Sequence, residues 1–397
     1  MQIYLVGGAV RDKLLSLPVK DKDFVVVGAT PAEMLAQGYQ QVGKDFPVFL
    51  HPRTKQEYAL ARTERKSGSG YTGFTCYAAP DVTLEQDLVR RDLTINAIVE
   101  DQSGQVIDPL NARADLDNRL LRHISASFSE DPLRVLRVAR FAARFHQLGF
   151  TIADETLMLM QAMTQAGDLA ELTPERVWQE VEKTLSAANP EVFFNVLKEI
   201  GALAIILPEL DSLFNLNKNI NSGNETDLEP ESTPEKNSLG QQALIQLKRS
   251  ASLSPDLAIR FAALMQQLNN HQVSIKALAK RCKVPNEHRD LALQVSAQQS
   301  NIHNAISLTP ADIIAIFDQT DAWRKPERFQ QILLTCSSSQ AKLLVDEYPP
   351  TEYLTKMLSV ACDIAVQPII AAGFRGPEIK QQLTAQRITA LTALRAQ

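Results

Sequence analysis

The chain has 397 residues and a formal net charge of -5, and 45% of its residues are hydrophobic and 22% charged. This is the composition of an ordinary soluble globular protein, long enough for about two to four domains. The acidic balance excludes a generally basic nucleic-acid coat, so a nucleic-acid partner would have to be held by local basic patches.

The lack of a recognisable signal peptide and the spacing of the cysteines predict a reducing compartment. The sequence shows no signal peptide and no obvious apolar run of about 18 residues, which predicts no membrane role. The four cysteines are far apart and form no Cys-x-x-Cys pair. They predict reduced thiols in a cytoplasmic protein rather than disulfides or zinc ligands.

The first 27 residues predict a phosphate-binding turn. Residues 3–6 and 24–27 are short apolar runs typical of strands, and residues 9–17 predict a helix after Gly7 and Gly8. Glycine lets the backbone approach a phosphate closely, and a helix N-terminus attracts anions. The glycine spacing matches neither a dinucleotide fingerprint nor a P-loop.

Asp21 and Asp23 precede the second of these strands. Two residues apart on a strand, they point to the same face. Paired carboxylates of this kind can hold Mg²⁺ ions shared with substrate phosphates, and two such ions stabilise both oxygens of an in-line displacement. An isolated Asp-x-Asp is more often a solvated loop, so the argument rests on its combination with the glycine turn.

That combination, residues 7–12 followed by 21–23, resembles the first motif of the polymerase-β-like nucleotidyltransferases. The branch it resembles contains the tRNA CCA-adding enzymes and the bacterial poly(A) polymerases. The resemblance implies an α+β fold, with a small mixed β-sheet nucleotidyltransferase head followed by an all-helical neck, body and tail. It also implies that Asp21 and Asp23 bind Mg²⁺ and that Gly8 and Arg11 hold the nucleotide.

Residues 42–62 alternate in polarity and predict two strands joined by a turn at residues 51–54. Residues 65–73 are glycine-rich and basic at their start. We interpret them as a mobile loop beside the site, with an inert surface loop as the alternative.

Residues 89–97 form the second informative stretch. Arg91 can reach a triphosphate, and Asp92 with Asn96 can hydrogen-bond a ribose hydroxyl. Alone, such a run usually forms exposed salt bridges. It resembles the second motif of the same family, whose residues contact phosphate and ribose. A short helix expected at residues 112–121 then ends the catalytic head, residues 1–122.

Residues 129–141 are the most specific stretch. Ser129 is expected to cap a helix that has Pro132 in its first turn. Arg134, Arg137 and Arg140 then recur along one slowly drifting face among apolar residues. Their burial would be costly without anionic or polar partners, so unless the face is solvated, it leaves room for a triphosphate and a base.

This segment can also select a base without a template. Cytosine and adenine present an amino donor beside a ring-nitrogen acceptor, which suits the Asp131 carboxylate and the Arg134 guanidinium. Uracil and guanine present the opposite order, and each buried mismatch costs about 1–3 kcal/mol. The resemblance agrees, because class II CCA-adding enzymes use the corresponding Glu-Asp-x-x-Arg for base selection, with the following arginines on the nucleotide.

The rest of the chain is expected to be helical. Residues 171–180 resemble the fifth motif of the family, which buttresses the base-reading helix, and Glu175, Arg176 and Glu180 are interpreted as structural. The neck spans residues 123–214, a polar linker or disordered insert spans 215–240, and a tRNA-binding body and tail span 241–397.

Two features of the helical part bear on further activities. Many Gram-negative relatives carry a His-Asp phosphohydrolase domain, but His271, His288 and His303 are followed here by Gln, Arg and Asn. We therefore predict no phosphohydrolase metal site. A basic cluster is either a solvated surface or a place for RNA phosphates; its members are Lys276, Lys280, Arg281, Lys283 and Arg289.

Together these features predict a class II tRNA nucleotidyltransferase that uses CTP, ATP and Mg²⁺ to add CCA to the tRNA 3′ end, without DNA or membrane partners. Alternatives are a poly(A) polymerase, against which Asp45 stands where those enzymes tend to be basic, and an enzyme that adds only CC. A catalytically silent RNA-binding protein is a third. A third catalytic carboxylate stays open, with Asp87 and Asp92 as candidates.

Overall fold

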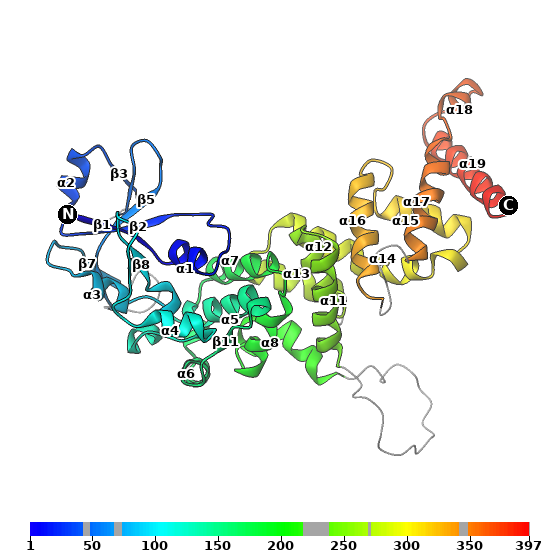
Figure 1. Cartoon of the computed structure of the whole chain (residues 1–397). Coiled ribbons are helices and arrows are strands. Elements are labelled where there is room, and N and C mark those ends of the chain that lie inside the picture. Colours follow the sequence, from blue (N-terminus) through cyan, green and yellow to red (C-terminus); the bar gives the residue numbers. More distant parts are fainter. Residues whose placement is uncertain (43–47, 67–73, 217–237, 269–270, 341–347, 397) are drawn as a thin grey trace, which may run out of the picture. The chain divides into compact units, whose positions relative to one another are not determined.

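The computed structural model describes residues 1–42, 48–66, 74–216, 238–268, 271–340 and 348–396. Two compact units account for it. The first comprises Met1–Thr184 with Val192–Ile206, and the second comprises Leu185–Glu191 with Leu207–Gln397. The first unit contains the sheets and the second contains helices (Figure 1).

The first unit is built on a mixed seven-stranded sheet with the order β3-β4-β5-β2-β1-β8-β9. Strands β2 and β5 run parallel, and the other neighbours are antiparallel. The strands are β1 (Gln2–Val6), β2 (Asp23–Val27), β3 (Gln40–Val42), β4 (Val48–Leu50), β5 (Glu57–Leu60), β8 (Val99–Glu100) and β9 (Val106–Ile107). The predicted α+β class and the strands at residues 3–6 and 24–27 are confirmed.

Strand β2 lies at the centre of the sheet because both of its faces are buried. Val25 packs with Val6 and Leu88 in one cluster, whereas Val26 packs with Phe49 in another. A strand buried on both faces is expected to be a continuous apolar run, as residues 24–27 are. The rigid centre of the sheet therefore carries Asp23 at the first residue of β2.

The helices of this unit depart from the predicted bounds at their ends. Helix α1 (Gly8–Leu14) stops before residue 17 because Ser16 adopts a left-handed φ of 56°. Helix α4 (Ala112–Asp117) likewise ends before Arg119, whose φ is 59°. The chain then forms β10 (Leu120–Leu121), which pairs in parallel with β11 (Thr151–Ile152). The neck is therefore not wholly helical.

The remaining elements of this unit flank the sheet or follow it. A separate hairpin consists of β6 (Thr63–Lys66) and β7 (Phe74–Tyr77). The helices are α2 (Pro31–Ala36), α3 (Leu84–Val89), α5 (Leu133–Phe145), α6 (Asp154–Gln165), α7 (Pro174–Leu185), α8 (Glu191–Glu199) and α9 (Leu203–Ile206).

The start of α5 differs from the prediction. Ser129 lies in a short 3₁₀ turn, and its hydroxyl donates to the carbonyl of Ala126 rather than capping the helix. Pro132 occupies the N-cap position and no side chain caps the helix in that way, but the Asp131 carboxylate accepts from the backbone N–H of Leu133 at 3.1 Å. The prediction that Ser129 caps the helix is therefore wrong. The Asp131 carboxylate, which is expected to select the base, is held at the start of the helix.

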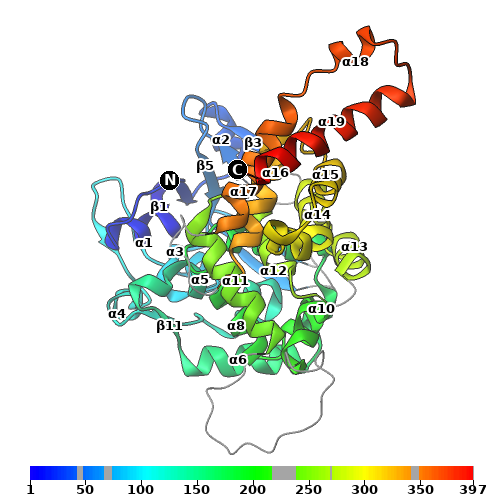
Figure 2. The same cartoon turned by 90° about the vertical axis from the view of Figure 1, so that its right-hand side faces the viewer.

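The second unit is helical in its described residues, as predicted (Figure 2). Helix α14 packs against α12, α13 and α16, with Phe317 and Phe329 meeting edge to face in the core. The helices are α10 (Pro208–Asp211), α11 (Leu239–Leu253), α12 (Leu257–Met265), α13 (His271–Arg281), α14 (Asn286–His303), α15 (Pro310–Gln319), α16 (Pro326–Ser337), α17 (Pro349–Cys362), α18 (Gln367–Ala371) and α19 (Pro377–Arg395).

One stretch of the second unit, Pro349–Ala371, is long and apolar enough to cross a membrane by length and composition alone. The structure divides this stretch between α17 and α18, with residues 363–366 outside either helix. Three other predictions fall mainly outside the described residues: the Asp45 region, the glycine-rich loop from residue 67, and the polar insert from residue 217.

Candidate active site

A cavity of about 600 Å³ in the first unit is lined by all of the predicted site residues. They come from five separate segments: the β1–α1 turn, the start of β2, residues 90–96, α5 and the residue before Pro132. The residues are Gly8, Arg11, Asp21, Asp23, Arg91, Asp92, Asn96, Asp131, Arg134, Arg137 and Arg140. The fold therefore gathers the motifs that the sequence analysis singled out.

The cavity is strongly basic. Nine arginine and lysine side chains line it against four aspartates. Five of these cations belong to the predicted set, and the other four are Arg90, Arg144, Arg176 and Lys183. A wall of this charge suits a polyanion such as a nucleoside triphosphate.

Gly7 forms the turn between β1 and α1, with a left-handed φ of 66°. A Cβ at this position would come within 3.2 Å of the Arg91 guanidinium. Glycine is needed both for the backbone conformation and for the close approach of Arg91. The turn thus places Gly8 and Arg91 on the same side of the cavity.

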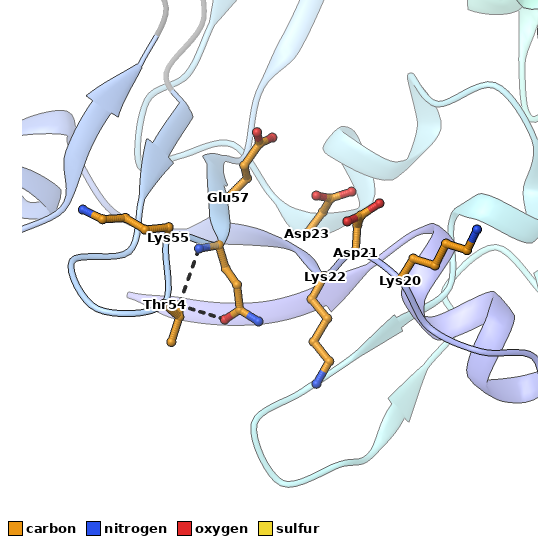
Figure 3. A pocket seen from close by; sticks show the side chains of 8 residues that line it. Lys20, Asp21, Lys22, Asp23, Thr54, Lys55 and Glu57 are labelled. Atoms are coloured by element: carbon orange, nitrogen blue, oxygen red, sulfur yellow. Dashed lines mark hydrogen bonds between the residues drawn. The ribbon is translucent and has the colours of Figure 1, made fainter. Parts of the chain in front are cut away.

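Asp21 and Asp23 are exposed, and their carboxylates project to the same side of the chain while Lys22 points away (Figure 3). Partial loss of hydration beside the surrounding protein raises the pKa of Asp23, the Arg91 charge opposes this, and the neighbouring Asp21 carboxylate raises it further. A cation shared by the two carboxylates would offset the repulsion between their negative charges. The pair fits a divalent metal with oxygen ligands.

Glu57 is a carboxylate that the sequence analysis missed. It lies directly opposite Asp23 in the parallel register of β2 and β5, and it projects toward the same side (Figure 3). Within the described ranges, no three His, Cys, Asp or Glu side chains are close enough to form a ready-made metal site. Glu57 is therefore a neighbour of the pair, not part of a closed cluster.

The two residues considered for a third catalytic carboxylate, Asp87 and Asp92, already form ion pairs and hydrogen bonds with other residues of the protein. Asp87 is fully buried and accepts from Arg90 at 2.6 Å, from Arg91 at 3.0 Å and from the Arg62 backbone. Burial alone would raise its pKa, but the two arginines hold the pKa of Asp87 below its ordinary value. Its geometry indicates that it anchors Arg90 and Arg91.

Asp92 has the same character. It accepts from Arg137 at 2.7 Å, from the Asn96 amide at 2.8 Å and from the Leu93 backbone at 2.9 Å. Although burial would raise its pKa, the Arg137 charge and these hydrogen bonds hold the pKa of Asp92 well below its ordinary value. Asp92 and Asn96, expected at a ribose, contact each other beside the cavity.

This pairing predicts a pH-dependent loss of stability on Asp92→Asn. We expect a loss of about 2 kcal/mol at pH 7, below the range for a fully buried pair because one-third of the Arg137 side chain is exposed. A depressed folded-state pKa stabilises above the unfolded value of about 3.9, and this stabilisation declines as the pH falls below it. Urea unfolding at pH 7 and at about pH 3 should show the gap between wild type and variant narrowing. A constant gap would contradict the ion pair.

Arg11 is the most buried of the predicted nucleotide contacts, with 2% of its surface exposed. Its guanidinium donates to the Asp12 carboxylate at 2.7 Å and to the side-chain oxygen of Asn96. It also lies over the rings of Phe141 and Phe145, 5.2 and 4.9 Å from their centroids. These contacts tie α1 to α5 and indicate that Arg11 positions the site.

The α5 arginines are compensated by partners distant in sequence. Arg134 donates to the backbone carbonyls of Ser127 at 2.8 Å and Arg90 at 2.6 Å. Arg137 pairs with Asp92, and Arg140 pairs with Glu180 of α7. The face is therefore not simply solvated. Its charges are partly balanced before any ligand binds.

Helix α7 supplies a contact that the sequence analysis interpreted only as structural. Arg176 donates to both oxygens of Asp131, at 3.2 and 2.8 Å, in a two-pronged ion pair. Both residues line the cavity. Arg176 and Glu180 are four residues apart and so share a helix face, but nothing local in the sequence identifies their partners, Asp131 and Arg140.

Comparisons with known proteins define the class. The family "Poly A polymerase head domain" matches residues 3–122, and "Probable RNA and SrmB- binding site of polymerase A" matches residues 149–214. The "complex structure of CCA-adding enzyme with ATP" has the same fold, with a TM-score of 0.68 at 18% identity, covering 98% of this chain and 86% of the other. Residues 3–122 therefore have the head domain of the poly(A) polymerase type.

Two relatives narrow this class. The "Multifunctional CCA protein" of Aliivibrio salmonicida is 53% identical, and that of Tolumonas auensis is 51% identical, each over 98% of both chains. At this identity and coverage, the chain belongs to the family of CCA-adding tRNA nucleotidyltransferases. Members of this family use divalent metal ions in general.

Proposed function

We propose that this protein adds cytidine, cytidine and adenosine to the 3′ end of tRNA from CTP and ATP, without a nucleic-acid template. One observation carries the proposal: the Asp21–Asp23 pair and the Asp131–Arg134 pair line a single basic cavity. The relatives named multifunctional CCA protein support it, and so do structures with the same fold that contain ATP, CTP or tRNA. Incorporation of CMP and AMP, but not UMP or GMP, into tRNA lacking its terminus tests it.

We propose that the metal is Mg²⁺ and that Asp21 and Asp23 hold it, with Glu57 as a neighbouring carboxylate on β5. The exposed pair, the raised pKa of Asp23 and the all-oxygen donor set support this assignment. When bound, Mg²⁺ would neutralise phosphate charge and stabilise the attacking and leaving oxygens. The α-phosphate would then lie beside this pair.

Gly8, Arg91, Arg137 and Arg140 would hold the triphosphate, and Asp92 with Asn96 would meet the ribose. Arg11 would act on them indirectly, through its contacts with Asn96 and the α5 rings. Because ion pairs and hydrogen bonds already hold most of these side chains in place, a nucleotide would find them oriented. Catalysis would then consist mainly of positioning and charge neutralisation.

Base selection would rest on the hydrogen-bond capacity of Asp131. One carboxylate oxygen accepts from Leu133 and Arg176, and the other accepts from Arg176 at 2.8 Å. An ionised carboxylate has about four acceptor positions, so the second oxygen retains one for the amino group of cytosine or adenine. A uracil or guanine carbonyl at this point would meet a second acceptor. Arg176 would hold the Asp131 carboxylate in the orientation that this contact needs.

The other assignments are proposed on the same basis. Residues 1–122 would act as the catalytic head and 123–214 as the neck, and the helices of 241–397 would bind tRNA. In the second unit, Lys276, Lys280, Lys283 and Arg289 line a cavity of about 610 Å³, whereas Arg281 pairs with Glu209. The free, widely spaced cysteines support a cytoplasmic location. That the chain lacks phosphohydrolase activity stays a prediction.

A further inference from the structure

A second cavity, of about 570 Å³, shares Asp21 and Asp23 with the first (Figure 3). Its other walls are the segment just before β2 and the turn between β4 and β5. Lys20 and Lys22 come from the first of these, and residues 54–57 come from the second. The carboxylate pair thus borders two cavities of similar size, both within the first unit.

The second cavity offers cations that the protein does not use. Lys20, Lys22 and Lys55 are exposed, and none of the three forms an ion pair with another described residue. In the first cavity, by contrast, most arginines have carboxylate or carbonyl partners. Unpaired ammonium groups beside a catalytic centre are available to an anionic ligand.

The β4–β5 turn holds one of these ammonium groups, that of Lys55, and the side-chain amide of Gln56 in a specific arrangement. Lys55 has a left-handed φ of 58°, and its N–H donates to the His51 carbonyl at 3.0 Å. Glycine adopts this conformation with less strain than lysine does, so Lys55 is held in a strained backbone conformation. The Thr54 hydroxyl donates to the side-chain oxygen of Gln56 at 3.0 Å. The N–H₂ of the same side chain therefore remains a donor at the cavity wall.

The geometry of phosphoryl transfer assigns an occupant. The attacking and leaving oxygens lie on roughly opposite sides of the phosphorus. The first cavity has the basic wall and the base-selecting pair, so it would hold the nucleotide and its departing pyrophosphate. The attacking hydroxyl must then approach Asp21 and Asp23 from another side, where the second cavity opens.

We infer that the second cavity receives the 3′-terminal nucleotides of the single-stranded RNA acceptor, with Lys20 and Lys55 binding their phosphates. The inference rests on the proposed function. The terminal 3′-oxygen bonds to the α-phosphorus, the bond from that phosphorus to pyrophosphate breaks, and the hydroxyl proton passes to water. Lys22 projects to the opposite side of the chain from the carboxylates and is assigned no phosphate.

The test is the double variant Lys20→Ala/Lys55→Ala, compared with Arg53→Ala. Arg53 is exposed in the same turn but lines neither cavity, so it serves as a control for removing a nearby positive charge. For the double variant, we expect KM for tRNA lacking its terminus to rise about tenfold, with KM for CTP unchanged. In a plot of the logarithm of tRNA affinity against the logarithm of salt concentration, the slope for the double variant should become shallower by about 0.7 for each RNA phosphate that is no longer bound. Arg53→Ala should match wild type, and all variants should share its melting temperature.

Two results would overturn the inference. One is an unchanged KM for tRNA in the double variant while the wild type incorporates CMP normally, which leaves the proposed function intact. The other is a parallel rise in KM for CTP, which would place the incoming nucleotide in the second cavity. Failure of the wild type to extend any RNA with CTP and ATP would instead remove the proposed function, and the inference with it.

Discussion

Asp23→Asn is expected to lower the rate of nucleotide incorporation about 10³-fold or more. The substitution keeps the shape of the side chain but removes one of the two charges of the Asp21–Asp23 pair, and with it a metal ligand. Loss of a single electrostatic group at a reacting centre costs about 10²–10³ in rate, and loss of a metal ligand costs at least as much. Single-turnover incorporation of CMP into tRNA measures the effect.

Glu57→Gln is the matched comparison for this variant. It makes the same change on the neighbouring strand, opposite Asp23 in register. If Glu57 is a supporting ligand, the rate should fall about tenfold, in line with the loss of an outer metal partner. Equilibrium binding of CTP without metal should be unchanged in both variants. An Asp23→Asn protein that keeps more than a tenth of wild-type activity would contradict the catalytic assignment.

Asp131→Ala is expected to remove the preference for CTP and ATP over UTP and GTP. The side chain supplies the acceptor for the base amino group, and each mismatched buried polar group is worth about 1–3 kcal/mol. Loss of this term alone corresponds to about 10–100-fold in selectivity. The ratio of kcat/KM for CTP to that for UTP, measured on the same tRNA, reports it.

Substitutions of Arg176, which pairs with Asp131, test the same prediction in a second way. Arg176→Gln removes the charge that orients Asp131 but leaves α7 intact, so selectivity should fall about tenfold with little change in melting temperature. Arg176→Lys keeps the charge without the two-pronged geometry and should recover part of the selectivity. Equal effects on all four nucleotides would show that Arg176 only supports the fold.

Local pattern predicted the parts of this site that lie within one element. The Gly7–Gly8 turn, the carboxylate pair before β2 and the arginine spacing of α5 are all short-range signals. They correctly indicated which residues line one cavity. Helix ends were less accurate, because single left-handed residues such as Ser16 and Arg119 end the helices.

Partners across the fold could not be predicted from pattern. Arg11–Asn96, Arg137–Asp92 and Arg176–Asp131 each join residues at least 45 positions apart. Glu57 meets the carboxylate pair only through the parallel register of β2 with β5, which local alternation does not fix. The cap predicted at Ser129 was misplaced because Ser129 lies in a 3₁₀ turn before α5, and Pro132 occupies the N-cap position.

The most direct test of the proposed function is product length on a tRNA that lacks its last three nucleotides. With Mg²⁺ and CTP alone, the purified protein should add two residues and stop, and with CTP and ATP it should add three and stop. Asp23→Asn should add none. A long adenosine tail with ATP would indicate a poly(A) polymerase, and two cytidines that ATP cannot extend would indicate CC addition. No extension by wild type under any condition would contradict the account.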